Sequence, residues 1–331
     1  MKNKALILTV IAIALLVCGS LIYKQLDTKT KSTHQVAKVG ILQYVTHEAL
    51  DEIEKGIEDG LADAGYSGDN VELTLLNAEG DQSKIQTMSR QLVSADNDVL
   101  IGIATPAAQA LASATSDIPV VMGAVTDPVG AKLVKDLEKP EGNVTGLSNK
   151  TPIKQAVELI GTLTPTAKTI GVLYASSEDN SVSQVADFKK YAQEAGLTVK
   201  EYAVPTTNEI KTTMSVMTGQ VDAVFVPQDN TIASAFTTVV DVANTANLPV
   251  YSSVDSMVKE GSIAAISQSQ YNLGLETAKV AVKLLAGKKV SEVPVEIVDT
   301  GEVTLNMKAI KALGITVPAD VLETADIVVA E

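Results

Sequence analysis

The 331-residue chain is poor in the residue types on which many catalytic and metal sites depend. It has one cysteine, two histidines, three phenylalanines and no tryptophan. Cys18 alone cannot form a disulfide within the chain, so the fold needs an apolar core, which 46% hydrophobic residues can supply. So few histidines and cysteines offer no transition-metal cluster, and we expect no metal site.

Several enzyme motifs are also missing. The sequence contains no GxGxxG or GxxxxGK[ST] phosphate loop and no GxSxG nucleophile elbow. A two-lobed amino-acid racemase would need paired cysteines in its cleft, and this chain has one cysteine near its N-terminus. The net charge of −14 argues against nucleic acid as a partner. We therefore expect a binding protein with no catalytic residues and no cofactor, not an enzyme.

The N-terminus predicts export from the cytoplasm. Residues 1–23 are expected to be a signal peptide or a membrane anchor, because two lysines precede an apolar run long enough to span a bilayer. The letters LLVCGS resemble a bacterial lipoprotein box that would lipidate Cys18, although Val17 stands where a small residue is usual. Cleavage after Ser20 and no cleavage are the alternatives. Residues 24–35 are polar and predict a spacer.

The rest of the chain repeats one α/β pattern. Apolar runs typical of buried parallel strands begin at Val39, Val71, Asp98 and Ile118, and again at Ile170, Thr198, Asp222 and Leu248. Corresponding runs are 131, 127, 124 and 130 residues apart, and amphipathic helical patterns lie between them. We expect an α/β fold of two doubly wound, parallel-sheet lobes, joined by a hinge with a cleft between them.

The repeat also predicts the limits of the lobes. The first lobe is expected over residues 36–150, and the second over residues 151–299. Strand-like residues at 295–305 and a helix at 306–313 follow the second lobe. We expect residues 300–331 to return to the first lobe.

A strand, a helix and a strand are predicted within residues 98–128. Thr105 suits the N-cap of this helix, and Pro106 suits its first position. The free N–H groups that follow, including that of Ala107, would lie at the carboxyl edge of the sheet. Ligands bind at this edge in open α/β folds, and a helix N-terminus there favours an anion. Alternatively, Thr105 only caps its helix.

Polar side chains are frequent in the loops that follow the predicted strands. The candidate ligand-binding residues are Gln43, Tyr44, Val45, His47, Thr105, Pro106, Ala107, Thr126, Asp127, Asn149, Tyr174, Ser176, Ser177, Asp229, Asn230, Ser253 and Tyr271. Asp229 follows a buried run and would complement a ligand ammonium group, whereas Asn230 could be a simple N-cap. Glu178 and Asp179 are expected to be solvated or to interact favourably with a helix dipole, and Ser181 is expected to cap a helix rather than contact the ligand.

An aromatic slot is one interpretation of the ring-bearing candidates. Tyr44, Tyr174 and Tyr271, together with His47, could surround the ring of a ligand. Each tyrosine could equally serve in core or hinge packing.

Several stretches between residues 39 and 315 carry a resemblance to a known family. They read VGILQYVTHEALD, IGIATPAAQAL, PVVMGAVTDPV, GNVTGLSN, VLYASSEDNS, VFVPQDN, PVYSSVDSMVKEG, SQSQYNLG and LNMKAIKALGI. Together they resemble solute-binding proteins of bacterial ABC importers with the type I periplasmic-binding fold, and most of all the members that bind tryptophan and related aromatic amino acids. The resemblance implies that hydroxyls of Thr105 and Thr126, with backbone amides, hold a ligand carboxylate, and that Asp229 takes the ammonium.

The function that the resemblance implies is transport. The protein would capture an amino acid, an aromatic one, outside the cytoplasm and deliver it to permease and ATPase subunits. It would act as a monomer attached to the cell membrane by its anchor or lipid. The alternatives are a purine-like or sugar-like solute, a ligand-sensing domain coupled to a signalling partner, and, third, an enzyme acting in the cleft.

Overall fold

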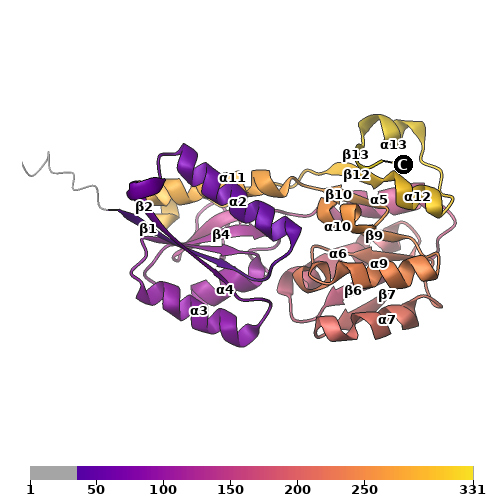
Figure 1. Ribbon diagram of the computed structural model, residues 1–331, viewed down its shortest axis with the longest axis horizontal. Helices are drawn as coiled ribbons and strands as arrows, with labels where there is room; N and C mark the ends of the chain where they lie inside the picture. Colours follow the sequence, from indigo (N-terminus) through magenta and orange to yellow (C-terminus); the bar gives the residue numbers. More distant parts are fainter. Residues whose placement is uncertain (1–35, 331) are drawn as a thin grey trace, which may run out of the picture.

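The computed structural model describes residues 36–330, which form two α/β lobes (Figure 1). Indigo to magenta segments build most of the first lobe, which also includes one orange helix, and magenta to yellow segments build the second. The predicted signal or anchor at residues 1–23, with Cys18, and the spacer at residues 24–35 lie outside the described residues.

The first lobe is built on a six-stranded parallel sheet in the order β11-β5-β4-β3-β1-β2. The strands are β1 Ala37–Gln43, β2 Val71–Asn77, β3 Val99–Ile103, β4 Val120–Val125, β5 Val144–Ser148 and β11 Glu296–Ile297. The helices are α2 Glu48–Asp63, α3 Gln82–Ser94, α4 Thr105–Ala114 and α11 Gln270–Leu285, with 3₁₀ turns at Gly68–Asn70 and Val290–Glu292.

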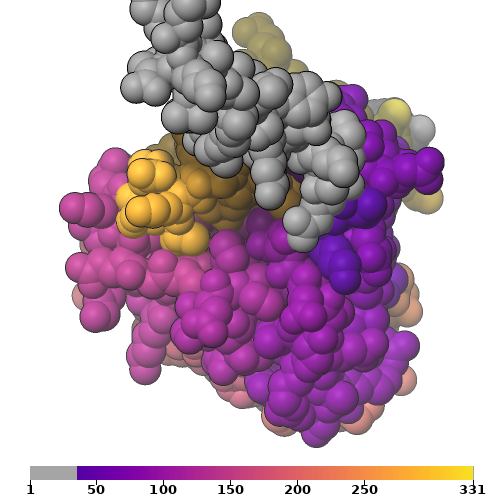
Figure 2. All heavy atoms as spheres, turned by 90° about the vertical axis from the view of Figure 1, so that its left-hand side faces the viewer, coloured from indigo at the N-terminus to yellow at the C-terminus, as the bar shows by residue number. Residues whose placement is uncertain are grey.

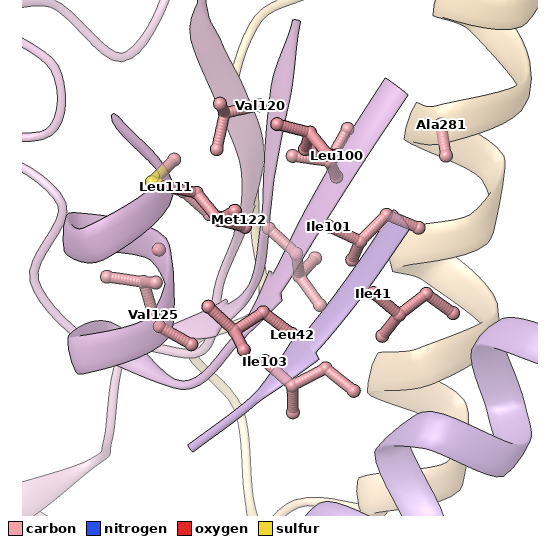
Figure 3. Packing of buried hydrophobic residues seen from close by; sticks show 14 of the residues in the cluster. Ile41, Leu42, Leu100, Ile101, Ile103, Leu111, Val120, Met122, Val125 and Ala281 are labelled. Carbon is pink, nitrogen blue, oxygen red and sulfur yellow. The ribbon is translucent and has the colours of Figure 1, made fainter. Parts of the chain in front are cut away.

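Helices cover both faces of this sheet, which explains why its central strands are apolar without alternation. Figure 3 shows Ile41 and Ile101 on the face toward α11, where Ala281 lies, and Leu111 of α4 on the opposite face. Strands β3 and β4 are buried at every residue.

The second lobe is built on a seven-stranded sheet in the order β13-β12-β10-β9-β8-β6-β7, in which only the β10–β12 pair is antiparallel. The strands are β6 Thr169–Ala175, β7 Thr198–Val204, β8 Ala223–Val226, β9 Val250–Ser252, β10 Ala264–Ser267, β12 Glu302–Asn306 and β13 Asp326–Val329. The helices are α5 Ile153–Leu163, α6 Asp179–Glu194, α7 Ile210–Met217, α8 Asn230–Ala233, α9 Phe236–Thr245, α10 Asp255–Glu260, α12 Met307–Ala312 and α13 Ala319–Thr324, with a 3₁₀ turn at Thr207–Glu209.

The strand order repeats as the sequence predicts. Strands β2-β1-β3-β4-β5 of the first lobe correspond in order to β7-β6-β8-β9-β10 of the second. The expected pair of doubly wound, mostly parallel lobes is therefore confirmed, and the carboxyl ends of both sheets supply loops to the space between the lobes.

The expected return of residues 300–331 to the first lobe is wrong. Strand β12 pairs with β10, and β13 pairs with β12, so this segment completes the second sheet. Helix α11 and strand β11 return to the first lobe instead, although both lie before residue 300. Figure 2 shows this end of the molecule, where orange residues that follow α11 lie against magenta ones of the first lobe.

The physical reason for the return of α11 is a close helix pair. Cβ atoms built on Gly56 of α2 and Gly274 of α11 would each lie 2.2 Å from a backbone oxygen of the other helix. Only glycine at these two positions lets the helix backbones approach so closely. The hydrophobic pattern of the sequence indicates that α11 is amphipathic, but it does not indicate which lobe the helix packs against.

The chain consequently crosses between the lobes three times, at residues 149–152, 268–269 and 298–301. Gln268 in the second crossover donates hydrogen bonds to the carbonyls of Lys150, at 3.4 Å, and Val298, at 2.8 Å. One side chain thus joins the three hinge segments. Among residues 36–330, no helix combines the length and the hydrophobicity needed to cross a bilayer.

Candidate functional site

A cavity lies between the two lobes. Its polar lining consists of His47, Thr105, Thr126, Asn149, Asn180, Gln228, Asp229, Asn230 and Gln270. Its apolar lining consists of Ala49, Leu50, Ile53, Ala104, Ala124, Ala233, Val254 and Met257. A cavity between two lobes with a partly polar and partly apolar lining is typical of small-molecule sites.

The first lobe presents the N-terminus of α4 to this cavity. The helix begins at Thr105, and Ala104 occupies the N-cap position, so the expectation that Thr105 is the cap is wrong. Thr105 is buried and lines the cavity. Pro106 and Ala107 follow in the first turn, buried behind it and outside the lining. The free N–H groups of this turn provide positive potential for an anion.

The second lobe presents two buried carboxylates. Asp229 is 1% exposed and caps α8: it accepts hydrogen bonds from the N–H groups of Ala175, at 2.5 Å, and Ile232, at 2.8 Å. Asn230 is the first residue of α8, so it is not the N-cap. Burial, followed by the negative charge of Glu178, raises the pKa of Asp229 to about 7.

Glu178 is fully buried, so the solvated alternative is wrong, but it lies at the N-cap position of α6, where its charge is favourable to the helix dipole. Its carboxylate accepts hydrogen bonds from the backbone N–H and side-chain amide of Asn230, the backbone N–H and hydroxyl of Thr231, and the side-chain amide of Asn180. These donors belong to α6 and α8 and close around the carboxylate. Glu178 therefore orders two amide side chains that line the cavity.

The differences from expectation at Glu178 and Ser181 have one cause, the position at which α6 begins. The helix begins at Asp179 with Glu178 at the N-cap position, so Ser181 lies inside the first turn and does not cap it. Asp179 is exposed as expected, but its carboxylate accepts a 2.8 Å hydrogen bond from Gln109 of the first lobe. An N-cap motif is short, and three neighbouring polar residues offer competing starts.

Several hydrogen bonds join the lobes around the cavity. Asn149 donates to the side-chain oxygen of Gln228 at 2.8 Å, and the hydroxyl of Thr126 lies 3.4 Å from the same oxygen. The ring of His47 lies 3.3 Å from the side-chain oxygen of Asn230. Because such contacts need both lobes, the structure represents a closed arrangement.

Two lining atoms are buried without a hydrogen-bond partner among the described residues. They are Nδ1 of His47 and the side-chain oxygen of Asn180. Burial lowers the pKa of His47, which favours a neutral ring. A bound molecule that supplies a donor to Asn180 would remove the cost of an unpaired buried acceptor.

The structure does not assemble the predicted aromatic slot. Tyr174 donates its hydroxyl hydrogen to Glu201 at 3.2 Å, and Tyr271 donates to Asp59 at 2.9 Å; neither lines the cavity. Tyr44 is buried and lines a neighbouring cavity. The pKa of Tyr44 is raised, first by burial and then by the charge of Glu178. Aliphatic side chains take the place of the tyrosines in the lining.

The remaining candidates lie outside the lining of this cavity. Val45 and Ser177 line the same neighbouring cavity as Tyr44. Asp127 accepts a 2.8 Å hydrogen bond across the lobes from Ser183, and Gln43 donates to Asp51. Ser176 is exposed, and Ser253 is buried. His47, Thr105, Thr126, Asn149, Asp229 and Asn230 are the predicted residues that the structure brings together.

Sequence reasoning missed 11 of the 17 lining residues. Gln228 directly precedes Asp229 in a loop that was predicted to reach the site. Its position next to a predicted residue could have identified it. Leu50 and Ile53 follow a helical hydrophobic pattern, which does not separate core from cavity. Within residues 36–330, no group of three histidine, cysteine or acidic side chains is placed to hold a metal ion.

Comparison with known proteins identifies the family. The model of the ABC transporter substrate-binding protein family matches residues 38–329. The chain belongs to this family. Its members bind the substrates of ABC transporters and act outside the cytoplasmic membrane.

Three relatives are informative. The chain is 41% identical over 288 residues to the tyrosine-binding protein of Clostridioides difficile, covering 87% of this chain and 83% of that one. It is 55% identical to a Streptococcus pneumonia ABC domain crystallised with L-Trp, with a TM-score of 0.87 and coverage of 88% and 99%. It is 37% identical to an open, ligand-free substrate-binding protein with adhesive properties from Clostridium difficile, with a TM-score of 0.68 and coverage of 89% and 100%.

Proposed function

We propose that this substrate-binding protein captures a free aromatic L-amino acid between its lobes and delivers it to the permease of an ABC transporter. The relatives that are called tyrosine-binding or were crystallised with L-Trp support this ligand class. The higher TM-score against the L-Trp complex than against the open structure supports a closed, ligand-accepting arrangement.

The observation that carries the proposal is a pair of buried carboxylates without a cation. Asp229 and Glu178 are 1% and 0% exposed, and neither forms a salt bridge among the described residues. An ammonium group at Asp229 would supply the missing positive charge and favour the ionised carboxylate. Asn180 offers its unpartnered oxygen to the same group.

The opposite wall suits a carboxylate. Thr105 and the free N–H groups of the first turn of α4 lie on the first-lobe side of the cavity. An amino acid bound by its carboxylate on one lobe and its ammonium on the other would prefer the closed state, because only that state satisfies both groups.

The ligand side chain would lie against aliphatic groups. From the second lobe, Val254 and Met257 would contact it. From the first lobe, it would be contacted by Leu50, Ile53, Ala104 and Ala124. Burial of an aromatic ring among aliphatic side chains and a thioether is favourable without aromatic partners.

Titration calorimetry tests the proposal. Wild-type protein should bind L-tryptophan or L-tyrosine with a Kd at least tenfold lower than that for L-leucine, and should bind N-acetyl-L-tryptophan weakly. D229N keeps the size of the side chain but removes its charge, so it should lose at least about thirtyfold in affinity for the free amino acids. Because N-acetylation removes the ammonium, D229N should change the binding of that ligand much less.

The outcomes separate the alternatives. Near-normal affinity of folded D229N would remove Asp229 from the ammonium role. If no aromatic amino acid binds the wild-type protein, mass spectrometry of molecules released by denaturation would show whether it carries a purine-like or sugar-like solute, and the proposed function would be wrong.

We further infer that the protein stays attached to the membrane through Cys18 or an uncleaved N-terminal segment, and acts as a monomer. The support is the lipoprotein-like LLVCGS stretch within an apolar run. Cells grown with a labelled fatty acid should label the wild-type protein but not C18A, and C18A should be mis-processed or released. Unlabelled wild-type protein that remains in the membrane fraction would favour the uncleaved anchor, and wild-type protein released to the medium would contradict attachment.

A further inference from the structure

Two alanines in the wall of the cavity have backbone conformations that favour glycine. Ala104 has φ 74° and ψ 160°, and Ala124 has φ 58°. Side chains other than hydrogen are strained in this half of φ/ψ space, and the region that Ala104 occupies is used almost only by glycine. The two positions are neighbours, because Ala104 follows β3 and Ala124 lies near the end of β4.

The same part of the sheet contains glycines where space requires them. A Cβ atom on Gly102 would lie 2.6 Å from backbone atoms of Ala108, and one on Gly146 would lie 2.3 Å from the backbone nitrogen of Met122. Alanine is therefore absent where it would collide, yet present at positions 104 and 124, where it is strained. Ala104 and Ala124 both line the cavity, at 4% and 8% exposure.

The hydrogen bonding around Ala104 shows that its conformation is held by the fold. Its N–H donates to the carbonyl of Gly123 at 3.0 Å, and its carbonyl accepts from Ala108 at 3.1 Å. The first bond ties the end of β3 to β4, and the second begins α4. The backbone of Ala104 therefore cannot rotate out of its strained conformation without breaking one of these hydrogen bonds.

We propose that the methyl groups of Ala104 and Ala124 are specificity-determining: they limit the room for the ligand on the first-lobe side of the cavity. This proposal rests on the proposed function, because it concerns the fit of the aromatic ligand. The methyl groups work by exclusion and contact: with them, the ring fits closely, and without them, bulkier rings are admitted. Backbone strain at both positions is the cost of keeping these methyl groups.

The test uses A104G, A124G and a control, A110G. Ala110 is a buried alanine inside α4 that does not line the cavity. Affinities would be measured by calorimetry for L-tryptophan and for its 4-, 5-, 6- and 7-methyl derivatives. The temperature of unfolding would be measured without ligand.

We expect at least one ring-methylated tryptophan to gain at least fivefold in affinity relative to L-tryptophan in A104G or A124G. A110G should keep the wild-type ratios. In the absence of ligand, A104G and A124G should unfold at or above the wild-type temperature, because glycine relieves the strain, whereas A110G should unfold at a lower temperature because it places glycine inside a helix.

Unchanged ratios in both A104G and A124G, with L-tryptophan still bound, would overturn the proposal and leave the proposed function intact. Unfolding of both variants at lower temperatures, as in A110G, would contradict the strain on which the argument rests. If the wild-type protein binds no aromatic amino acid, the proposed function fails first and this proposal fails with it.

Discussion

Glu178 and Asp229 hold the same short helix at its N-terminus. Glu178 accepts a hydrogen bond from the N–H of Thr231, and Asp229 accepts one from the N–H of Ile232, each at 2.8 Å. The two carboxylates come from different strand–helix connections, and the charge of Glu178 adds to the cost of ionising Asp229. A ligand ammonium lowers that cost, so its binding and the protonation of Asp229 should be linked.

Ligand affinity should therefore depend on pH near neutrality. The pKa of Asp229 is raised to about 7, first by burial and then by Glu178. Below this pH, Asp229 must lose a proton before it can bind the ammonium, so affinity should fall by roughly tenfold for each pH unit below 7. Above pH 7.5 the affinity should level off. Calorimetry between pH 5.5 and 8.5 measures the profile.

The stability of the ligand-free protein should depend on pH in the opposite direction to ligand affinity. A carboxyl group whose pKa is raised by folding stabilises the folded state fully below its unfolded pKa, near 4, and this contribution is lost as the pH rises through 7. D229N should remove this part of the pH dependence of unfolding. An affinity that stays constant from pH 5.5 to 8.5 would contradict both the linkage and the ammonium role.

Thr105 and Tyr271 should respond differently to loss of their hydroxyl groups. T105V removes a hydroxyl that lines the cavity, so we expect affinity for an aromatic amino acid to fall by about tenfold. Y271F removes a hydroxyl that bonds to Asp59 outside the cavity, so affinity should stay within about twofold. Calorimetry on both variants checks the pair, and a larger loss in Y271F than in T105V would contradict the placement of the site.

The sequence was informative wherever a physical pattern is local. Apolar runs of five or six residues predicted strands such as β3 and β4, and their regular spacing predicted the repeat of two lobes. The carboxyl-edge rule then led to Thr105 and Asp229 in the cavity lining.

Contacts between residues far apart in the sequence could not be predicted in this way. The solvated role expected for Glu178 was wrong because its five hydrogen-bond donors include groups more than fifty residues away. The lobe assignment of α11 depends on its close packing against α2, as between Gly56 and Gly274, and no periodic pattern predicts that packing. The tyrosine slot was wrong because strand direction alone does not say on which face of β6 Tyr174 lies.

Stability should depend strongly on Gly274. G274A would place a Cβ atom 2.2 Å from the backbone oxygen of Ile53, so α2 and α11 must separate. We expect a loss of about 2–3 kcal/mol in the free energy of unfolding. G161A is the matched control, because Gly161 lies in α5 with open space around it, and alanine there should raise stability by about 0.5–1 kcal/mol. Urea unfolding of both variants measures the difference, and equal stabilities would contradict the close packing.

The ion pair between Lys259 and Glu48 should affect ligand release. The Nζ atom of Lys259 in the second lobe lies 2.7 Å from Glu48 in the first, so the pair exists only when the lobes are close together. Both side chains are about two-fifths exposed, and such pairs contribute about 0.2–1 kcal/mol. K259Q should therefore weaken ligand binding by about 1.5- to fivefold, through faster dissociation.

A second lysine provides the control for this prediction. Lys279 pairs with Glu276 within α11, so the pair does not depend on the arrangement of the lobes. K279Q should leave the dissociation rate unchanged. The effect of K259Q should shrink as salt rises from 50 mM to 1 M, because screening already weakens the exposed pair in the wild-type protein. Stopped-flow measurement of ligand release decides the matter: equal rates for wild type, K259Q and K279Q at low salt would show that this ion pair does not favour the closed state.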